Sequence, residues 1–220
     1  SDGCCCSIKW SFCRHKRVGM KKIKQIKSTM MPLPMSNVDT DQIMPKQFLK
    51  RVERSGYGKY LFFDWRKDVN GNLSPDFPLN KEIHKDAKVL VTGPNFGTGS
   101  SREHAPWGLQ DWGFDAIIST NFADIFKNNC LNIGLIPVEV SAEILERLFE
   151  LIKKDSKTIV DISIENKLLI CADIHTDFFL DDFSRQKLIM GQDQIDITLE
   201  HEDSIKKFAL ARKGEIPSLD

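Results

Sequence analysis

The sequence predicts an α/β protein in which helices cover a parallel sheet and further strands add to it in antiparallel orientation. Three observations support this class. Short apolar segments typical of strands alternate with amphipathic, helix-like segments between residues 87 and 152. Two alternating segments, 158–164 and 167–172, flank a turn at Glu165-Asn166, as in a β-hairpin. A composition of 41% hydrophobic and 28% charged residues is that of a globular domain, which excludes a disordered or fibrous chain.

The first part of the chain has less regular patterning. The Asx-rich stretch 37–41 predicts a turn with helix-capping residues, and a short helix is expected over 42–49. Residues 50–84 contain many Gly, Asn, Pro and aromatic residues and predict a long loop, which in a compact domain is usually functional or mobile. Its arginines are expected on a solvated face, with contact to substrate or a partner as the alternative: Arg51, Arg54 and Arg66. No strand is predicted before residue 87.

Regular alternation of strands and helices begins at residue 87. Strands are predicted over 87–92 (AKVLVT), 115–119 (DAIIS) and 135–140 (LIPVEV). Helices are predicted from Arg102 or Glu103 to about 111, and over 122–129, 182–190 and 193–212. Ser141 is the expected N-cap of another helix with one continuous apolar face, made of Ile144, Leu145, Leu148, Phe149 and Ile152.

Charge and cysteine content restrict the partners and the compartment. Thirty-one Lys and Arg balance thirty-one Asp and Glu, so no electrostatic argument supports a nucleic-acid or anionic-membrane partner. No apolar run approaches the roughly 20 residues of a membrane-spanning helix. After residue 13 the chain has only Cys130 and Cys171, which is typical of a reducing compartment. We therefore expect a cytoplasmic protein in which both thiols are buried.

Residues 1–19 differ from the remainder. They carry four cysteines, which suggests a metal-binding or redox segment, yet they contain no CxxC motif and His15 is their only histidine. They also show no apolar periodicity and no signal-peptide core. We expect residues 1–19 to be a non-native or disordered extension, with Met20 as the start of a working protein of residues 20–220. The four cysteines are Cys4, Cys5, Cys6 and Cys13.

One motif concentrates the chemistry: GPNFGTGSSREH, residues 93–104. Its glycines let backbone N–H groups approach a ligand, and the helix that follows adds unpaired donors and a partial positive charge. Pro106 is tolerated only in the first turn of that helix, so residues 97–101 are expected to form a loop with outward amides and hydroxyls. Arg102 supplies a planar fork for a carboxylate or phosphate. The motif predicts an anion site.

Familiar motifs do not account for this segment. The third glycine of the dinucleotide fingerprint is missing, and neither GK[ST], GxSxG nor HExxH occurs. A purely structural interpretation stays open, in which a serine caps the helix and Arg102 forms a buried ion pair.

The motif and its surroundings resemble a known family. GTGSSREHAPWGL (97–109) and GFDAIISTNFADIFKNNCLNIGLIPVEV (113–140) are similar to the swivel domain of the aconitase superfamily. Residues 20–220 as a whole resemble the small subunits of bacterial-type 3-isopropylmalate dehydratase, or isopropylmalate isomerase. The closer likeness depends on NVDTDQIMPKQFL (37–49), YLFFDWR (60–66) and ITLEHEDSI (197–205).

This resemblance implies a fold and an activity. The fold is a three-layer β/β/α swivelling domain with a mainly parallel central sheet. The activity is that of a hydro-lyase in leucine biosynthesis, which isomerises 2-isopropylmalate to 3-isopropylmalate by dehydration to 2-isopropylmaleate and rehydration. The partner is a large subunit that carries a [4Fe–4S] cluster, in a heterodimer or a higher heteromer. Residues 20–220 have too few cysteines to ligate a cluster by thiolates alone, so no cofactor or metal is expected on this chain.

The resemblance also implies roles for single residues. Ser100 corresponds to the general base, and Ser101 and Arg102 to groups that bind the carboxylate of a small dicarboxylate substrate. The residues expected at the edge of the site are Asp39, Thr40, Asp41, Gly97, Thr98, Gly99 and His104. Among these, the two aspartates are expected to be turn and capping residues, and the histidine to orient neighbours or lie on the helix surface.

Two alternative functions stay open. A sister hydro-lyase, such as homoaconitase or a methylmalate-type dehydratase, would share the motif. A non-catalytic anion-binding module would need no cluster-bearing partner.

Overall fold

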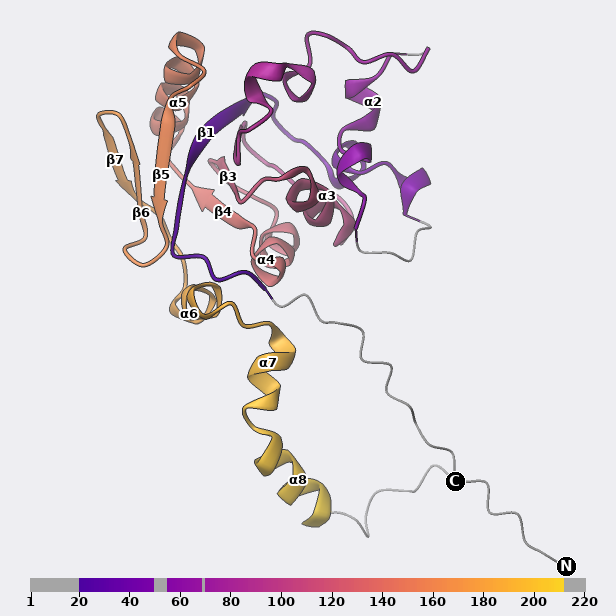
Figure 1. Ribbon diagram of the computed structural model, residues 1–220, viewed down its shortest axis with the longest axis vertical. Coiled ribbons are helices and arrows are strands. Elements are labelled where there is room, and N and C mark those ends of the chain that lie inside the picture. The colour runs from indigo at the N-terminus through magenta and orange to yellow at the C-terminus, as the bar shows by residue number, and fades with distance from the viewer. Residues whose placement is uncertain (1–19, 50–54, 69, 212–220) are drawn as a thin grey trace, which may run out of the picture.

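The structure, a computed structural model, describes residues 20–49, 55–68 and 70–211. A single seven-stranded sheet forms its centre, in the order β4-β3-β2-β1-β5-β6-β7 (Figure 1). The α/β class is confirmed. The strands are β1 (Gln25–Leu33), β2 (Val89–Thr92), β3 (Ala116–Ser119), β4 (Ile136–Glu139), β5 (Ile159–Ser163), β6 (Leu168–Cys171) and β7 (Ile174–Asp177).

The sheet is mixed, and its two halves meet at β1. The second half of β1 pairs in parallel with β2, from Met30 opposite Val89, whereas its first half pairs antiparallel with β5, from Gln25 opposite Ser163. Strands β2, β3 and β4 continue the parallel half, and β5, β6 and β7 the antiparallel half. The predicted antiparallel additions are confirmed, but the sheet is only partly parallel. Strand β1, which lies before residue 87, was not predicted from the sequence.

The α-helices are α1 (Thr40–Ile43), α2 (Phe63–Arg66), α3 (His104–Trp112), α4 (Asp124–Ile133), α5 (Ala142–Lys154), α6 (Asp182–Met190), α7 (Gln194–Leu199) and α8 (Glu202–Ala211). Short 3₁₀ helices are η1 (Lys46–Phe48), η2 (Gly58–Tyr60), η3 (Pro78–Asn80) and η4 (Glu82–His84). Among the described residues, no helix has the length and apolar character that crossing a membrane requires.

Two predicted helices are broken in the structure. The segment 42–49 divides into α1 and η1 because Pro45 forces Met44 into an extended conformation and has no N–H to donate. The predicted C-terminal helix 193–212 divides into α7 and α8 around Glu200 and His201. By contrast, α6 and the Ser141-capped α5 form as predicted, with the Ser141 hydroxyl accepting the Ile144 amide at 3.3 Å.

The sheet separates two hydrophobic cores. Alternate residues of β2 face opposite sides, so Val89 and Val91 join one core and Leu90 joins the other. The first core lies under α5, α6 and the curled hairpins β5 to β7, and Leu145, Leu148 and Ile152 of α5 are buried in it as predicted. The second core lies under α3, α4 and the segment 55–84 (Figure 1).

The described part of the segment 50–84 is a packed layer rather than an open loop. Tyr57, Leu61 and Phe62 are completely buried, and Trp65 stacks on Phe62 with 5.5 Å between ring centroids. The guanidinium of Arg66 lies 4.4 Å from the Trp112 ring centroid, and its Nε donates to Asn80 at 3.0 Å. Burial lowers the pKa of Arg66. The solvated face expected for Arg66 was therefore wrong, whereas Arg51, Arg54 and residues 1–19 lie outside the described residues.

Candidate functional site

Three loops meet at the carboxyl edge of the parallel strands. They follow β1, β2 and β3, whose carboxyl ends share one edge because the strands run in the same direction. The Ser119 hydroxyl donates to the carbonyl of Gly93 at 2.8 Å, which joins two of the loops. Asn95 donates from its side chain to Asn37 at 2.8 Å and accepts from the side chain of Asn121, so all three loops are connected.

The segment Asp39-Thr40-Asp41-Gln42 forms the first wall of the site. Asp39 caps α1 by accepting the Gln42 amide at 2.7 Å, and the Gln42 side chain accepts the Asp39 amide at 2.9 Å. This reciprocal capping box fixes the start of a helix of only four residues. The predicted capping role is confirmed for Asp39.

The glycine-rich loop runs beside this wall like a second strand. Thr40 donates its amide to the carbonyl of Thr98 at 2.8 Å, and Gly97 donates to the carbonyl of Val38 at 2.7 Å. Thr98 also donates to Val38, at 3.3 Å. The prediction that the amides of residues 97–101 all point outward was therefore wrong for the first two, because pairing with residues 38–40 occupies them. Gly99, Ser100 and Ser101 are the exposed positions of the loop.

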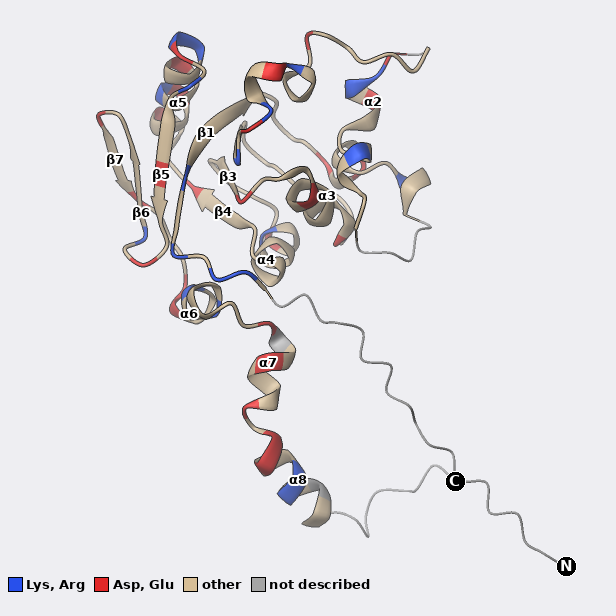
Figure 2. Cartoon of the chain, viewed as in Figure 1, with Lys and Arg blue, Asp and Glu red and all other residues tan. Residues whose placement is uncertain are grey.

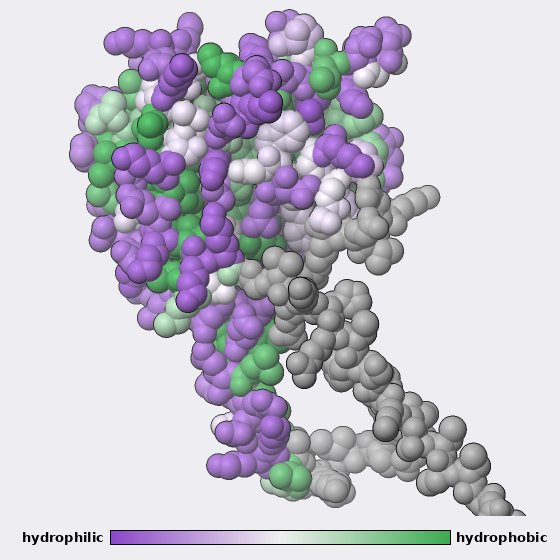
Figure 3. Space-filling view, viewed as in Figure 1, coloured by the Kyte–Doolittle hydropathy of each residue, from purple (hydrophilic) through white to green (hydrophobic). Residues whose placement is uncertain are grey.

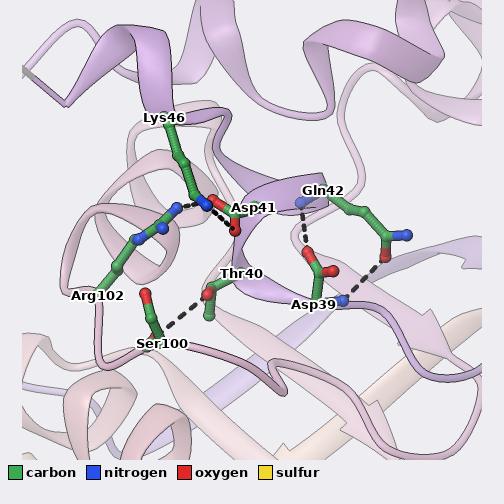
Figure 4. A network of polar contacts seen from close by, with 7 residues as sticks. All are labelled: Asp39, Thr40, Asp41, Gln42, Lys46, Ser100 and Arg102. Atoms are coloured by element: carbon green, nitrogen blue, oxygen red, sulfur yellow. Dashed lines mark hydrogen bonds and ion pairs between the residues drawn. The ribbon is translucent and has the colours of Figure 1, made fainter.

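Residues of helix α1 contact Ser100 and Arg102, the two loop residues on which the predicted chemistry depends (Figure 4). The Thr40 hydroxyl donates to the carbonyl of Ser100 at 3.1 Å, and Asp41 forms an ion pair with Arg102. The Lys46 ammonium lies 3.4 Å from the other Asp41 oxygen, so one carboxylate lies between two cations. The Arg102 side chain is only 13% exposed, against 40% for Asp41.

The Arg102–Asp41 pair is the contact that the structural interpretation of Arg102 requires. It does not use up the guanidinium, which carries five N–H donors in a planar fork. Arg102 also lines a pocket beside the loop. The geometry therefore gives Arg102 a local partner and an open side that faces a ligand space.

The pocket has a volume of about 210 Å³ and a second wall that the sequence analysis missed. This wall is the first turn of α4, preceded by Ala123 at the N-cap, which has no side-chain oxygen to accept a backbone amide. The signal that could have found it is its position directly after β3, at the same sheet edge. The pocket is lined by Thr40, Gly97, Gly99, Ser100, Arg102, Ala123, Asp124, Ile125 and Phe126.

The pocket is smaller than most complete binding sites. Complete small-molecule sites usually occupy about 300–1,000 Å³ and enclose most of the ligand. This pocket is smaller, and its loop residues Gly99 and Ser100 are exposed.

Gly97 is required by the close approach of the two walls. Its φ is +79°, and a Cβ placed on it would lie 2.2 Å from Cγ of Phe126. Phe126 is buried and contacts Phe96 edge-on, with 5.4 Å between centroids, so the ring has little freedom to move away. Glycine at this position lets the loop lie directly on α4.

His104 packs among aromatic rings beside the pocket. Its ring centroid lies 5.3 Å from that of Tyr57 and 4.8 Å from that of Trp107. Burial is the main cause that lowers the pKa of His104, and the charge of Arg102 adds to it, whereas Glu103 acts in the opposite direction. This position agrees with an orienting role. His104, Ser101, Thr98, Asp39 and Asp41 adjoin the pocket in sequence without being part of its lining.

The cysteines do not fit an iron–sulfur cluster on the described part of this chain. Cys130 lies in the core beneath α3 and α4, and Cys171 lies in the core on the opposite face of the sheet. Burial raises the pKa of both thiols, which disfavours the thiolate that ligates iron. In residues 20–49, 55–68 and 70–211, no group of three or more His, Cys, Asp and Glu side chains could hold a metal ion. The prediction of two buried thiols is confirmed.

The fold and the loop together define a member of the aconitase superfamily. Residues 20–143 match the family described as the aconitase C-terminal domain. The fold is similar to a crystal structure of 3-isopropylmalate dehydratase from Methanocaldococcus jannaschii, with a TM-score of 0.59 and 24% identity over 83% of this chain and 99% of that one.

Curated relatives identify a narrower family within the aconitase superfamily. A 3-isopropylmalate dehydratase small subunit of Rubrobacter xylanophilus is 44% identical over 198 residues, which cover 90% of this chain and 98% of the relative. That of Nitrosomonas eutropha is 44% identical over 91% of this chain and 99% of the relative, and that of Bacillus thuringiensis 43% over 86% and 96%. The chain belongs to the family of 3-isopropylmalate dehydratase small subunits.

Proposed function

We propose that this chain is the substrate-binding and proton-transferring half of a 3-isopropylmalate dehydratase. It isomerises 2-isopropylmalate to 3-isopropylmalate through 2-isopropylmaleate, together with a large subunit that holds the [4Fe–4S] cluster, in the cytoplasmic pathway to leucine. In this proposal residues 20–220 form a three-layer swivelling domain that closes on the large subunit.

The observation that carries the proposal is the likeness to whole small subunits. The relatives align over 96–99% of their own length at 43–44% identity, so no part of their fold is missing from the alignment. The half-enclosed pocket of about 210 Å³ supports an enzyme that is completed by another subunit. It argues against an anion-binding module that works alone.

The pocket lining suits a substrate with a carboxylate and an apolar group. Arg102 and the exposed end of the glycine-rich loop offer N–H donors, whereas Ala123, Ile125 and Phe126 offer apolar surface. Ile125 is 52% exposed on the first turn of α4, which leaves its side chain accessible to a ligand. This combination favours an isopropyl-substituted malate over a hydro-lyase substrate whose groups are all charged.

In the proposed mechanism Ser100 takes the proton from the carbon that carries no hydroxyl while the C–O bond of the adjacent carbon breaks and hydroxide leaves, which gives 2-isopropylmaleate. After the intermediate has turned over, the proton returns to the carbon that lost the hydroxyl and hydroxide adds to the other carbon. The Lewis acid that would accept the leaving hydroxide is the cluster of the large subunit. A serine alkoxide needs stabilisation, which the Arg102 charge and the N-terminus of α3 provide here. Thr40 fixes the Ser100 backbone, and Asp41 fixes the guanidinium of Arg102, so both groups are oriented before substrate binds. Arg102 and Ser101 hold a substrate carboxylate, which sets the distance from Ser100 to the C–H bond.

The proposal is tested by co-expression with a large subunit of this enzyme family. The purified complex is assayed by the absorbance of the unsaturated intermediate with 2-isopropylmalate, homoisocitrate and methylmalate as alternative substrates. We expect turnover of 2-isopropylmalate by the complex and none by the small subunit alone. A preference for another substrate would assign a sister hydro-lyase. Tight binding of a carboxylate by the isolated chain, without turnover in any complex, would contradict the proposal.

A further inference from the structure

Asp124 is a carboxylate in the candidate pocket that has no role in the proposed mechanism. It is the first residue of α4, and it lines the pocket together with Ser100 and Arg102. Asp124 is exposed, and among the described residues its side chain forms neither a hydrogen bond nor an ion pair. The pocket therefore contains a negative charge that the described part of the chain does not neutralise.

The cations around Asp124 have other partners. Asp124 and Lys127 are the two charged residues of α4, which is otherwise uncharged (Figure 2). The Lys127 ammonium pairs with Glu139 of β4 at 2.8 Å, and Arg102 pairs with Asp41. A ligand that enters the pocket thus meets the Asp124 charge without a cation paired to it.

A structural role accounts for only part of this position. The N-terminus of a helix carries a partial positive charge, which favours an acidic residue in the first turn. Glu143 in α5 and Asp182 in α6 are acidic residues of this kind that lie outside the pocket lining. The helix explains why an acidic residue is stable at position 124, but not what its charge does to a ligand in the pocket.

The residues next to Asp124 in the pocket wall are apolar: Ala123, Ile125 and Phe126. An exposed apolar residue such as Ile125 does not mark a site by itself, because hydrophobic and hydrophilic residues are interspersed over the surface in Figure 3. Here, however, apolar side chains flank an unpaired charge within one pocket of about 210 Å³. This wall favours an apolar ligand group and repels an anionic one.

The substrates of the proposed function carry an apolar group that suits this wall. 2-Isopropylmalate and 3-isopropylmalate each have two carboxylates and one isopropyl group. In the proposed mechanism Arg102 and Ser101 hold one carboxylate, which leaves the isopropyl group for the apolar wall of α4. A substrate with a third carboxylate in place of the isopropyl group would bring that charge beside Asp124. Specificity often depends on such repulsion of the wrong ligand as well as on attraction of the right one.

We propose that Asp124 is a specificity-determining residue, which excludes substrates with a third carboxylate by charge repulsion. The inference rests on the proposed function, because that function supplies the substrate in the pocket. It narrows the substrate class to malates with an uncharged substituent and disfavours a tricarboxylate. Asp124 takes no part in proton transfer, so its charge determines which ligand binds.

The test compares two ligands of similar shape and different charge. Isocitrate is malate with a carboxymethyl group on the carbon that carries isopropyl in 3-isopropylmalate, and 3-isobutylmalate is its uncharged counterpart. The inhibition constant Ki of each is measured against turnover of 2-isopropylmalate by the complex with the large subunit. For the wild type we expect isocitrate to bind more weakly than 3-isobutylmalate. Asp124→Asn should lower the ratio of the two Ki values about tenfold, as expected for one charge–charge interaction at a partly screened site.

Further variants separate the charge of Asp124 from its place in the helix. Asp124→Glu keeps the carboxylate and should keep the wild-type ratio, whereas Asp124→Lys should lower the ratio more than Asp124→Asn does. Glu143→Gln is the matched control, because it removes an exposed acidic residue from the first turn of α5, outside the pocket lining. It should leave the ratio and the turnover of 2-isopropylmalate unchanged. Melting temperatures show whether each variant is folded.

Three results would overturn the inference on Asp124. One is a wild type that binds isocitrate as tightly as 3-isobutylmalate. Another is a Ki ratio that Asp124→Asn and Asp124→Lys leave at the wild-type value, even if they weaken assembly with the large subunit. A third is an equal change in Glu143→Gln, which would indicate an effect of overall charge.

The failure of this inference can be distinguished from the failure of the proposed function. In each of the three cases the wild-type complex still turns over 2-isopropylmalate, so only the assignment of Asp124 fails. If the wild-type complex does not turn over 2-isopropylmalate, the proposed function fails and the inference fails with it.

Discussion

The carboxyl edge of the parallel strands and the C-terminal arm, residues 193–211 with α7 and α8, are built in opposite ways. At the edge, hydrogen bonds join residues some sixty positions apart, such as Thr40 with Ser100, so the loops hold one another in place. In the arm the capping bonds are local, such as the Asp193–Asp196 capping box at the start of α7. The difference teaches that the loops at the edge are ordered by contacts between distant segments, whereas the helices of the arm are ordered by contacts within each helix.

The sharpest separation of the two regions is expected from Ser100→Ala. General bases typically contribute about 10²–10⁴-fold, so kcat of the reconstituted complex should fall by that factor while KM stays similar. The affinity for the large subunit should change much less than kcat, because the substitution removes one hydroxyl and leaves the loop backbone in place. Steady-state kinetics and calorimetry on the same samples check both. Near-normal turnover in a well-folded complex would contradict the assignment of Ser100.

The next largest effect separates substrate binding by Arg102 from a purely structural ion pair. Arg102→Lys keeps the charge but removes the fork, so kcat/KM should fall about 10- to 100-fold, as expected when a charge-assisted bidentate contact of about 1.5–3 kcal/mol is lost. Asp41→Asn should have a smaller effect in the same direction, because it loosens the guanidinium without removing it. Melting temperatures are measured alongside. A fall in stability with unchanged specific activity would support the structural interpretation.

Alanine substitutions at Gly97 and Gly99 test how tightly the glycine-rich loop packs on α4. Gly97→Ala should destabilise the fold by about 1–3 kcal/mol through its positive φ and by about 1–3 kcal/mol more through overlap with Phe126. Gly99 has φ +97°, but a Cβ there would approach no atom closer than 3.4 Å, so Gly99→Ala should cost only the backbone part. Urea unfolding of both variants checks the order. Equal losses would mean that the loop and α4 are not in tight contact.

A smaller effect is the pH dependence of the free energy of unfolding that arises from His84, which lies outside the arm. Burial and the charge of Lys81 lower the pKa of His84, so the folded protein resists protonation there, whereas the unfolded chain binds the proton near pH 6.5. The free energy of unfolding should therefore decrease as pH falls from about 6.5 toward the folded-state pKa, and His84 should have no effect above that range. His84→Phe should flatten this part of the pH profile in thermal unfolding. His175→Gln, at an exposed position on β7, should not.

The smallest effect is expected from deleting residues 1–19. They show no periodicity that could join a core, so melting temperature, assembly and turnover should equal those of the full chain. A clear loss in any of these would give the four cysteines of this segment a function and would contradict the expectation of a non-native or disordered extension.

The sequence predicted the elements whose apolar pattern has a single period. Helix α5 and the hairpin β5–β6 each show one face to one core, and both were found. Strand β1 was not predicted because its apolar residues face two cores: Met30 faces one and the adjacent Met31 faces the other. In addition, Lys27, Ser28 and Thr29 interrupt the apolar run. Its identity as the central strand depends on partners at distant positions, which local periodicity does not contain.

The site was predicted only in part, because a local sequence pattern does not contain contacts between distant segments. The reactive segment around Ser100 is contiguous, so its composition and its family likeness could be identified directly. Two features result from tertiary contacts between separate loops: the wall formed by the first turn of α4, and the ion pair of Asp41 with Arg102. Only the rule that loops after neighbouring parallel strands share an edge could have brought Ala123 and Ile125 into the site.

The position of β1 has a consequence for biosynthesis. Its parallel partner β2 follows about sixty residues later, and its antiparallel partner β5 about 130 residues later. At about 5–20 residues per second, the ribosome makes β5 roughly 6–26 s after β1. During that time the N-terminal half of β1, residues 25–29, lacks its strand partner, and contacts of such long sequence separation also close slowly. The nascent chain thus exposes unpaired backbone N–H and C=O groups of its central strand until β5 is made, and such an unpaired edge can pair with another chain.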